Sequence, residues 1–310
     1  MSVQSLTALD DLAALPYLKR RRRIARIAAL VLAAAALLSV FITFALVFIL
    51  VSESWGFFAT VPTFEFLTDT QWTPMFAEPH FGILPLLSGT LWAAGIALAI
   101  AIPFGLVFAI YLSEYASHRV RESVKPLLET LEAVPTVVYG YFALLFLTPL
   151  MQTFIPGLEG FNLLVPGIVL GIMIMPYVVS VSEDAMRAVP SGLREGAYAL
   201  GMSRFQTATR VVVPAAFSGI TAAFVLGMSR AVGETMVLAI AAGQNPQLTL
   251  DPREGAATIT AYIVQMSLGD VPYGSLAYQS IFAVGLVLFL ITLLFNVIGM
   301  YLRRRFREEY

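Results

Sequence analysis

Long apolar segments constrain the fold of this chain more than any other feature of its sequence. The first, residues 27–51, is interrupted only by Ser39 and Thr43. As a helix it would reach roughly 37 Å, enough to cross the hydrocarbon core of a bilayer with some tilt. Further apolar segments follow at residues 84–112, 126–150, 163–182, 214–242 and 277–302. The pattern predicts an all-α polytopic membrane protein with six transmembrane helices.

Composition excludes the main alternatives. The chain is 58% hydrophobic and 13% charged, with a mean hydropathy of +0.81, unlike a soluble globule or a disordered chain. The strands of an outer-membrane barrel would contain more polar, lumen-facing residues. Because cysteine is absent, there is no disulfide framework and no thiol catalyst. His80 and His118 are too far apart in the sequence to form a histidine metal cluster by themselves.

The distribution of basic residues predicts the orientation. All but two of the 19 Lys and Arg residues lie in four stretches, at 19–26, 119–125, 187–210 and 303–307. The positive-inside rule places these stretches and both termini in the cytoplasm. We expect a cytoplasmic basic N-terminus at 1–26, a single six-helix domain at 27–302 and a cytoplasmic basic tail at 303–310. A signal peptide would have a shorter apolar core, so the first segment is expected to be retained.

Several residues interrupt the apolar segments. Pro103, Pro135 and Pro176 lie inside them and should bend or break a helix there. The second and fifth segments are longer than one span requires, so part of each should kink or leave the membrane core. Glu129 and Glu132, near the start of the third segment, are expected in a first turn at the inner interface.

Two long loops, 52–83 and 244–278, are predicted on the side opposite the basic stretches. The first is rich in aromatic residues. Aromatic side chains at this position either anchor a loop at the membrane interface or form a docking surface for an external partner. The sequence leaves both interpretations open.

The cytoplasmic loop 183–213 is predicted to contain two capped helices. Residues 195–200 fit a short helix, and Gly201 fits the left-handed position that ends one. Ser203 and Gln206 have the spacing of a capping box that begins the next helix. The pair should lie against the inner face of the membrane.

This loop resembles the EAA motif of ABC importer permeases. Glu195, Gly196 and Ala197 correspond to its Glu-Ala-Ala, with Gly196 in place of the family's first alanine, and Gly201 and Pro214 complete the motif. The resemblance implies a coupling helix that docks in a groove of a separate ATPase subunit. The alternative is an amphipathic helix at the interface without a partner.

The ATPase has to be another chain. The two lysines, Lys19 and Lys125, do not end a glycine-rich phosphate-binding run. ATP and Mg²⁺ are therefore expected on the partner ATPase. No cofactor and no enzymatic activity are expected in this chain.

Two charges, Arg230 and Glu234, lie in the fifth segment at a spacing that puts them on one helix face. A charge at the bilayer centre costs on the order of 3 kcal/mol, which pairing would partly offset. Gly227 and Gly233 would allow another helix to approach. One interpretation is a structural ion pair. The other is a gate or anion path, in which Arg230 attracts an oxyanion and Glu234 holds or releases it.

Residues 229–236, Ser-Arg-Ala-Val-Gly-Glu-Thr-Met, resemble the permeases of phosphate transport systems, of the PstC type. Further resemblances to the same family occur at residues 66–68, 72–74, 81–85, 89–91, 103–105, 111–115 and 134–140. The resemblance implies a type I ABC importer permease fold in the cytoplasmic (inner) membrane. It also implies inorganic phosphate as the transported substrate, with Arg230 and Glu234 in its passage. The implied partners are a PstA-like second permease subunit, two copies of a PstB-like ATPase and an external PstS-like phosphate-binding protein; a nucleic acid partner is not expected.

The stretch 134–140 has two interpretations. Pro135 and Gly140 would loosen a helix, and the freed backbone groups would then have to face protein or a wet cavity. Thr136 and Tyr139 would line a translocation path there. Alternatively, the stretch is an ordinary proline kink whose hydroxyl groups bond to the helix backbone.

Other functions remain open at this stage. The same architecture would serve another oxyanion, such as molybdate or sulfate, because an arginine recognises charge more than identity. The PstA-type sister subunit usually has Ala-Pro where this chain has Met236 and Val237. A membrane-embedded enzyme would need a nucleophile and a base, and the two histidines are predicted in loops on opposite sides.

The predicted topology can be tested with single cysteines in place of Ser5 and Arg307. Both should resist membrane-impermeant thiol reagents in intact cells and react after the cells are permeabilised, because both termini are expected in the cytoplasm. Labelling of only one of them in intact cells would mean an odd number of spans.

Overall fold

The computed structural model describes residues 16–305, and it contains helices and no strand within that range. An isolated antiparallel bridge joins Trp72 and Phe81. The chain divides into two compact units, one ending at Ser52 and the other beginning at Glu53. Parts of the predicted terminal segments, residues 1–15 and 306–310, lie outside the described residues.

A single long helix, α2 (Pro16–Thr60), supplies the first unit and continues into the second. It extends beyond the predicted segment 27–51 in both directions. Its apolar window is long enough to cross a membrane as a single helix.

The second unit contains the remaining helices. They are α3 (Thr63–Thr68), α4 (Leu84–Ile110), α5 (His118–Glu132), α6 (Thr136–Phe142), α7 (Thr148–Gln152), α8 (Leu164–Arg187), α9 (Ser191–Ala199), α10 (Arg204–Thr207), α11 (Val213–Ala215), α12 (Phe217–Val232), α13 (Met236–Ala241), α14 (Ile259–Leu268) and α15 (Leu276–Arg305). Three π-helical turns join some of them, η1 (Tyr111–Tyr115), η2 (Ala143–Leu147) and η3 (Ala208–Val212).

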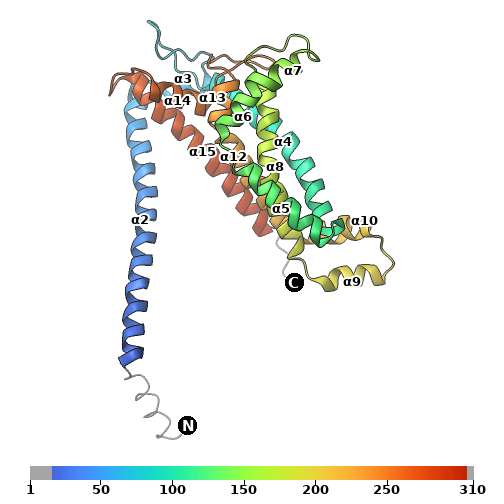
Figure 1. Ribbon diagram of the computed structural model, residues 1–310. Helices are drawn as coiled ribbons and strands as arrows, with labels where there is room; N and C mark the ends of the chain where they lie inside the picture. Colours follow the sequence, from blue (N-terminus) through green and yellow to red (C-terminus); the bar gives the residue numbers. More distant parts are fainter. Residues whose placement is uncertain (1–15, 306–310) are drawn as a thin grey trace. The chain divides into compact units, whose positions relative to one another are not determined.

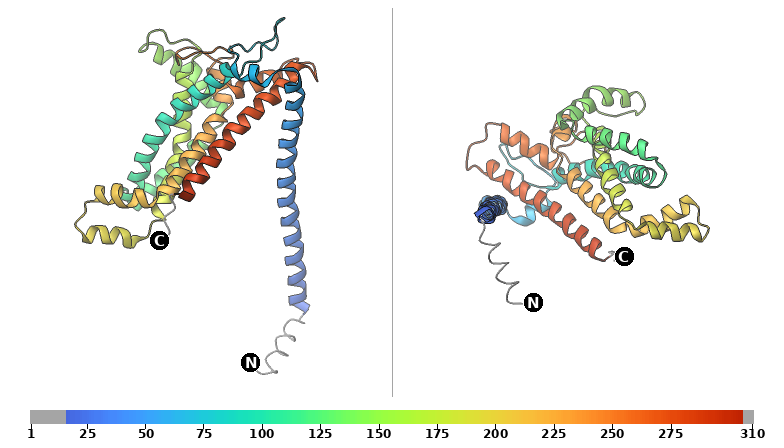
Figure 2. Two further views of the ribbon diagram at one scale, coloured as in Figure 1. Left: turned by 180° about the vertical axis from the view of Figure 1, so that it is seen from behind. Right: turned by 60° about the horizontal axis from the view of Figure 1, so that its bottom comes forward.

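The long helices of the second unit run between two ends. Helices α9 and α10 lie at one end, and α3, α7, α13 and α14 lie at the other (Figures 1 and 2). By length and composition, four of the described helices can cross a membrane, or up to six if each of two bent helix pairs forms one span. The prediction of an all-α, multi-pass membrane protein is confirmed.

The third predicted segment is not one helix. The chain is already helical from His118 and passes through Pro126 within α5. It then breaks at residues 133–135 and resumes as α6, with a bend of 84° between the two helical parts. The break falls at Pro135, which fixes its own φ angle and disfavours helical geometry in the preceding residue. Glu132 therefore lies in the last turn of α5, and the prediction that it lies in the first turn of a helix was wrong.

The fifth predicted segment is also broken. It was expected to begin at Pro214, but the chain bends by 72° just before α12, and the long helix begins at Phe217. A second break at residues 233–235 separates α12 from α13. By contrast, α4 and α8 continue past Pro103 and Pro176.

Glycines allow α8 to pack closely against α4 and α12. A Cβ atom added at Gly171 would lie 2.8 Å from the carbonyl oxygen of Ala97 on α4. On α12, a Cβ at Gly227 would lie 3.2 Å from Val178 of α8, so this glycine has the packing role that the sequence predicts. Close backbone approach is the usual source of helix association in membranes, where lipid removes most of the hydrophobic drive.

The aromatic residues of loop 52–83 serve two purposes. One group is buried in edge-to-face contacts at the α14 end: Phe57, Phe66, Trp72, Phe81 and, from α14, Tyr262. These residues form core. A second group is largely exposed: Trp55, Phe64 and Phe76. The two interpretations of the loop, anchor or docking surface, apply to the second group alone.

Arg253 is one of the two basic residues outside the four basic stretches, and it lies in loop 244–278. Its guanidinium donates hydrogen bonds to Asp251 and to the carbonyl of Pro156. The hydrogen bond from Arg253 lowers the pKa of Asp251 to about 2. The charge is paired with Asp251 in the same loop, and the bond to Pro156 joins loop 244–278 to the segment between α7 and α8.

The packing of α8 on α4 predicts a difference between two Gly→Ala substitutions. Gly171→Ala should lower the thermal unfolding midpoint in detergent, because its new methyl group meets the α4 backbone and overpacking costs about 1–3 kcal/mol. Gly95→Ala on α4 is the matched control, since nothing lies within 4 Å of a Cβ there. Equal midpoints for the two variants would contradict this account of the packing.

Candidate coupling and translocation sites

The predicted pair of capped helices is present in the loop between α8 and α12. Helix α9 ends before Gly201, whose φ of +80° is the left-handed geometry that the sequence predicts. In the capping box, the backbone N–H of Ser203 donates to Gln206 Oε1 at 2.9 Å, and the N–H of Gln206 donates to Ser203 Oγ at 3.3 Å. The turn between the helices is thus fixed by backbone geometry and by reciprocal hydrogen bonds.

The residues of the EAA motif are distributed over this helix pair. Glu195 and Gly196 are exposed on α9, whereas Ala197 on the same helix is buried. Pro214 is exposed in α11, close to the 72° bend. Two apolar side chains beside the turn, Leu200 and Phe205, are 85% and 67% exposed. An exposed carboxylate among exposed apolar side chains is suited to contact with another protein.

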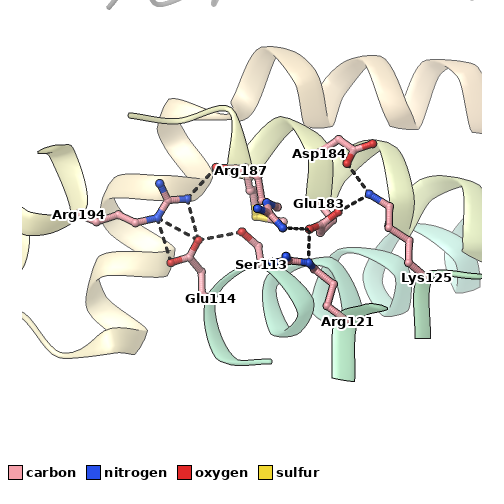
Figure 3. Close-up of polar contacts among 9 residues, drawn as sticks. Ser113, Glu114, Arg121, Lys125, Glu183, Asp184, Arg187 and Arg194 are labelled. Carbon is pink, nitrogen blue, oxygen red and sulfur yellow. Dashed lines mark hydrogen bonds and ion pairs between the residues drawn. The ribbon is translucent and has the colours of Figure 1, made fainter. Parts of the chain in front are cut away.

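A buried ion pair that the sequence did not predict fastens α9 to the transmembrane helices. The Arg194 guanidinium bonds to both carboxylate oxygens of Glu114 in η1, at 3.0–3.3 Å (Figure 3). It also donates to the carbonyl oxygens of Met186 and Val189, at 2.8 and 2.7 Å. Met186 lies in the last turn of α8 and Val189 just beyond the helix, and a cation is favourable beside the carbonyl oxygens at the C-terminal end of a helix. We call the Arg194–Glu114 pair and its two carbonyls the clamp.

A second charge cluster ties α5 to α8 beside the clamp. Glu183 is 1% exposed and accepts a 2.8 Å hydrogen bond from Lys125 of α5. Arg187 and Arg121 lie 3.7 and 4.0 Å from its other oxygen, and Lys125 also reaches Asp184 (Figure 3). Glu183 was predicted to begin the loop, but α8 continues to Arg187, so this residue lies within the helix.

The predicted pairing of Arg230 with Glu234 was wrong. Helix α12 ends at Val232, so the two residues do not share a helix face. Arg230 instead donates a 2.8 Å hydrogen bond to Glu132 at the end of α5. The prediction assumed an uninterrupted helix, and the break at 233–235 removes that assumption.

Glu234 has a structural task at this break. It is 8% exposed, and its carboxylate accepts hydrogen bonds from the backbone N–H groups of Met236 and Val237, at 3.1 and 3.4 Å. Its own backbone carbonyl accepts one from Thr260 at 2.7 Å. A broken span is tolerated only where its freed backbone groups find such partners.

Thr136 and Tyr139 lie in the first turns of α6, beyond the break at Pro135. Both are partly exposed. The Tyr139 hydroxyl donates a 2.7 Å hydrogen bond to the carbonyl oxygen of Leu131, the residue before Glu132. This contact matches the interpretation of a hydroxyl group bonded to the helix backbone, and it joins α6 to the end of α5.

Known proteins resemble this chain in sequence and in fold. Residues 101–308 match the family described as binding-protein-dependent transport system inner membrane component. The probable ABC transporter permease protein YqgH of Bacillus subtilis is 38% identical over 79% of each chain, and the phosphate transport system permease protein PstC of Mesorhizobium japonicum is 34% identical over 83% of each. A bacterial ABC transporter for import of alginate has a TM-score of 0.63 at 17% identity, over 93% of this chain and 100% of that one. The methionine ABC transporter MetNI has a TM-score of 0.53 at 18% identity, over 73% and 95%.

The clamp predicts that Arg194 positions the coupling loop. Arg194→Ala would leave the carboxylate of Glu114 buried at 4% exposure without its partner, a change that costs about 3–5 kcal/mol in comparable pairs. The thermal midpoint should fall, and chymotrypsin should cut at Tyr198–Phe205 faster than in the wild type. Arg204→Ala, an exposed position on α10, is the control. Identical midpoints and digestion rates in both variants would show that the clamp does not hold the loop.

Proposed function

Since the chain belongs to the family of binding-protein-dependent transport system inner membrane components, we propose that it is the permease subunit of an ATP-driven importer of inorganic phosphate. The observation that carries the phosphate assignment is the 34% identity to PstC of Mesorhizobium japonicum over 83% of both chains. The PstC of Haemophilus influenzae is similar to the same degree, at 34% over 83% of this chain. The geometry agrees with this function, since an arginine lies at the meeting point of two broken helices.

The coupling role is assigned to the α9–α10 pair. An ATPase subunit would contact the exposed surface of this pair, which includes Glu195, Leu200 and Phe205. When the ATPase displaces α9, the clamp transmits the movement to η1 and to the end of α8. The five contacts of the Arg194 guanidinium restrict relative motion between α9 and these two segments. Four further residues of the motif would set the backbone geometry of this surface: Gly196, Ala197, Gly201 and Pro214. They would not contact the transported ion.

The remaining assembly follows from the same proposal. A PstA-like subunit would complete the transmembrane pore, two PstB-like subunits would supply ATP and Mg²⁺ sites, and a PstS-like protein would deliver phosphate on the outer side. The complex would reside in the cytoplasmic membrane with both termini of this chain inside. In the pore, Arg230 would attract the anion, and Thr136 and Tyr139 would line the path. Glu234 would stabilise the break at 233–235 through its hydrogen bonds to the backbone.

Uptake by the reconstituted complex tests the function. Proteoliposomes that contain the four kinds of subunit should accumulate labelled phosphate when ATP is supplied on the ATPase side, and not when the ATPase carries an inactive site. Uptake of sulfate or molybdate in place of phosphate would reassign the substrate. ATP hydrolysis without movement of any oxyanion would contradict the proposal.

The coupling role predicts the effect of Glu195→Arg. Reversal of the charge on the exposed face of α9 should reduce co-purification of the ATPase and lower phosphate-stimulated ATP hydrolysis at least tenfold, while the permease remains folded. Asp270→Arg, an exposed charge reversal at the α14 end, is the control. Wild-type co-purification and hydrolysis in Glu195→Arg would remove the coupling role from this residue.

A further inference from the structure

Arg230 and Glu132 meet where two membrane helices break. Glu132 is the last residue of α5, and Arg230 lies in the last turn of α12. Beyond the breaks, α6 and α13 pack against each other, and a Cβ at Gly140 would lie 3.2 Å from the carbonyl oxygen of Met236. The ion pair therefore bridges two helix ends beside a close contact of the following helices.

The pair is held much less firmly than the clamp. Arg230 and Glu132 share one hydrogen bond and have side chains that are 35% and 30% exposed. Arg194 has five bonded contacts, and the Arg194 and Glu114 side chains are only 19% and 4% exposed. A guanidinium has five N–H donors, so Arg230 retains donors for another acceptor. One pair is buried and held by several hydrogen bonds, whereas the other is partly exposed and held by one.

We propose that Glu132 is the resident counter-ion of Arg230, a latch that occupies the arginine until a transported anion displaces it. The inference rests on the proposed function, because it needs an anion that passes Arg230. It adds Glu132, which neither the sequence motif nor the family resemblance singled out, as a positioning residue of the pathway.

The chemistry of the two acceptors makes the exchange feasible. Carboxylate and phosphate oxygens both accept hydrogen bonds from a guanidinium, and phosphate brings more charge and more oxygens. Exchange of one for the other never leaves Arg230 unpaired within the membrane, which would be costly. With Glu132 in place, the arginine is neutralised and does not attract ions in the absence of a delivered substrate.

The position of Glu132 also links the latch to the coupling end of the molecule. The same helix, α5, holds Glu183 and Asp184 through Lys125, about two turns before Glu132. Glu183 lies on α8 just before the carbonyls that Arg194 binds. If the ATPase displaced α9, the movement would therefore pass through the clamp to α8 and from Glu183 to Lys125 on α5. Glu132 is the last residue of α5, so it would move with this helix.

Glu132→Gln tests the latch in proteoliposomes that contain the whole complex. Without ATP, downhill phosphate permeation should rise up to about fivefold, the range expected when one partly exposed ion pair no longer competes for Arg230. The rise should disappear in the double variant Glu132→Gln with Arg230→Gln, since the arginine then attracts nothing. Glu129→Gln, one turn earlier on α5 and exposed, is the matched control and should leave permeation unchanged.

Two outcomes would overturn the latch. The first is wild-type permeation in Glu132→Gln when the complex is assembled. The second is loss of the complex in Glu132→Gln together with wild-type permeation in Glu132→Asp, which keeps the charge but shortens its reach; the pair would then be structural. If the wild-type complex transports sulfate or molybdate instead of phosphate, the proposed substrate is wrong, and the same variants test the latch with that anion.

Discussion

Every polar group of a membrane-embedded chain has to find its partner within the protein, and this constraint explains where the helices of this chain break. The break at 233–235 exists because Glu234 and Thr260 supply the hydrogen bonds that the helix gives up. The break at 133–135 has Pro135, which has no backbone N–H to pair, and Tyr139, whose hydroxyl donates to the carbonyl of Leu131 in α5. These two interruptions are therefore each matched by a side chain that forms hydrogen bonds to the nearby backbone.

The same constraint separates two kinds of ion pair. The clamp of Arg194 and Glu114 is buried and held by several hydrogen bonds, and removal of either partner leaves the other charge without its counter-ion. The pair of Arg230 and Glu132 is partly open, and each partner keeps capacity for another contact. Fixed pairs suit the transmission of movement, whereas open pairs suit exchange, and this chain places the fixed pair where α9 meets the spans and the open pair at the breaks.

Local signals in the sequence predicted much of this structure. The apolar segments gave the helices, and Gly201, Ser203 and Gln206 gave the turn between α9 and α10, because these signals act over a few residues. Contacts between distant segments were not predictable in this way. Glu114 and Arg194 are 80 residues apart, and the one available signal was a lone carboxylate directly after an apolar span. Arg230 was assigned the wrong partner because its helix was assumed to continue.

The length of α2 has a consequence for how the protein is made. Its apolar window is long enough to cross the bilayer by itself, so this helix can insert before any later segment exists. During synthesis it would enter the membrane as an independent first anchor, with its orientation set by the adjacent basic residues. Every later segment would then inherit that orientation, so charge changes near residues 19–26 would act on biogenesis, and the finished transporter would be affected only as a result.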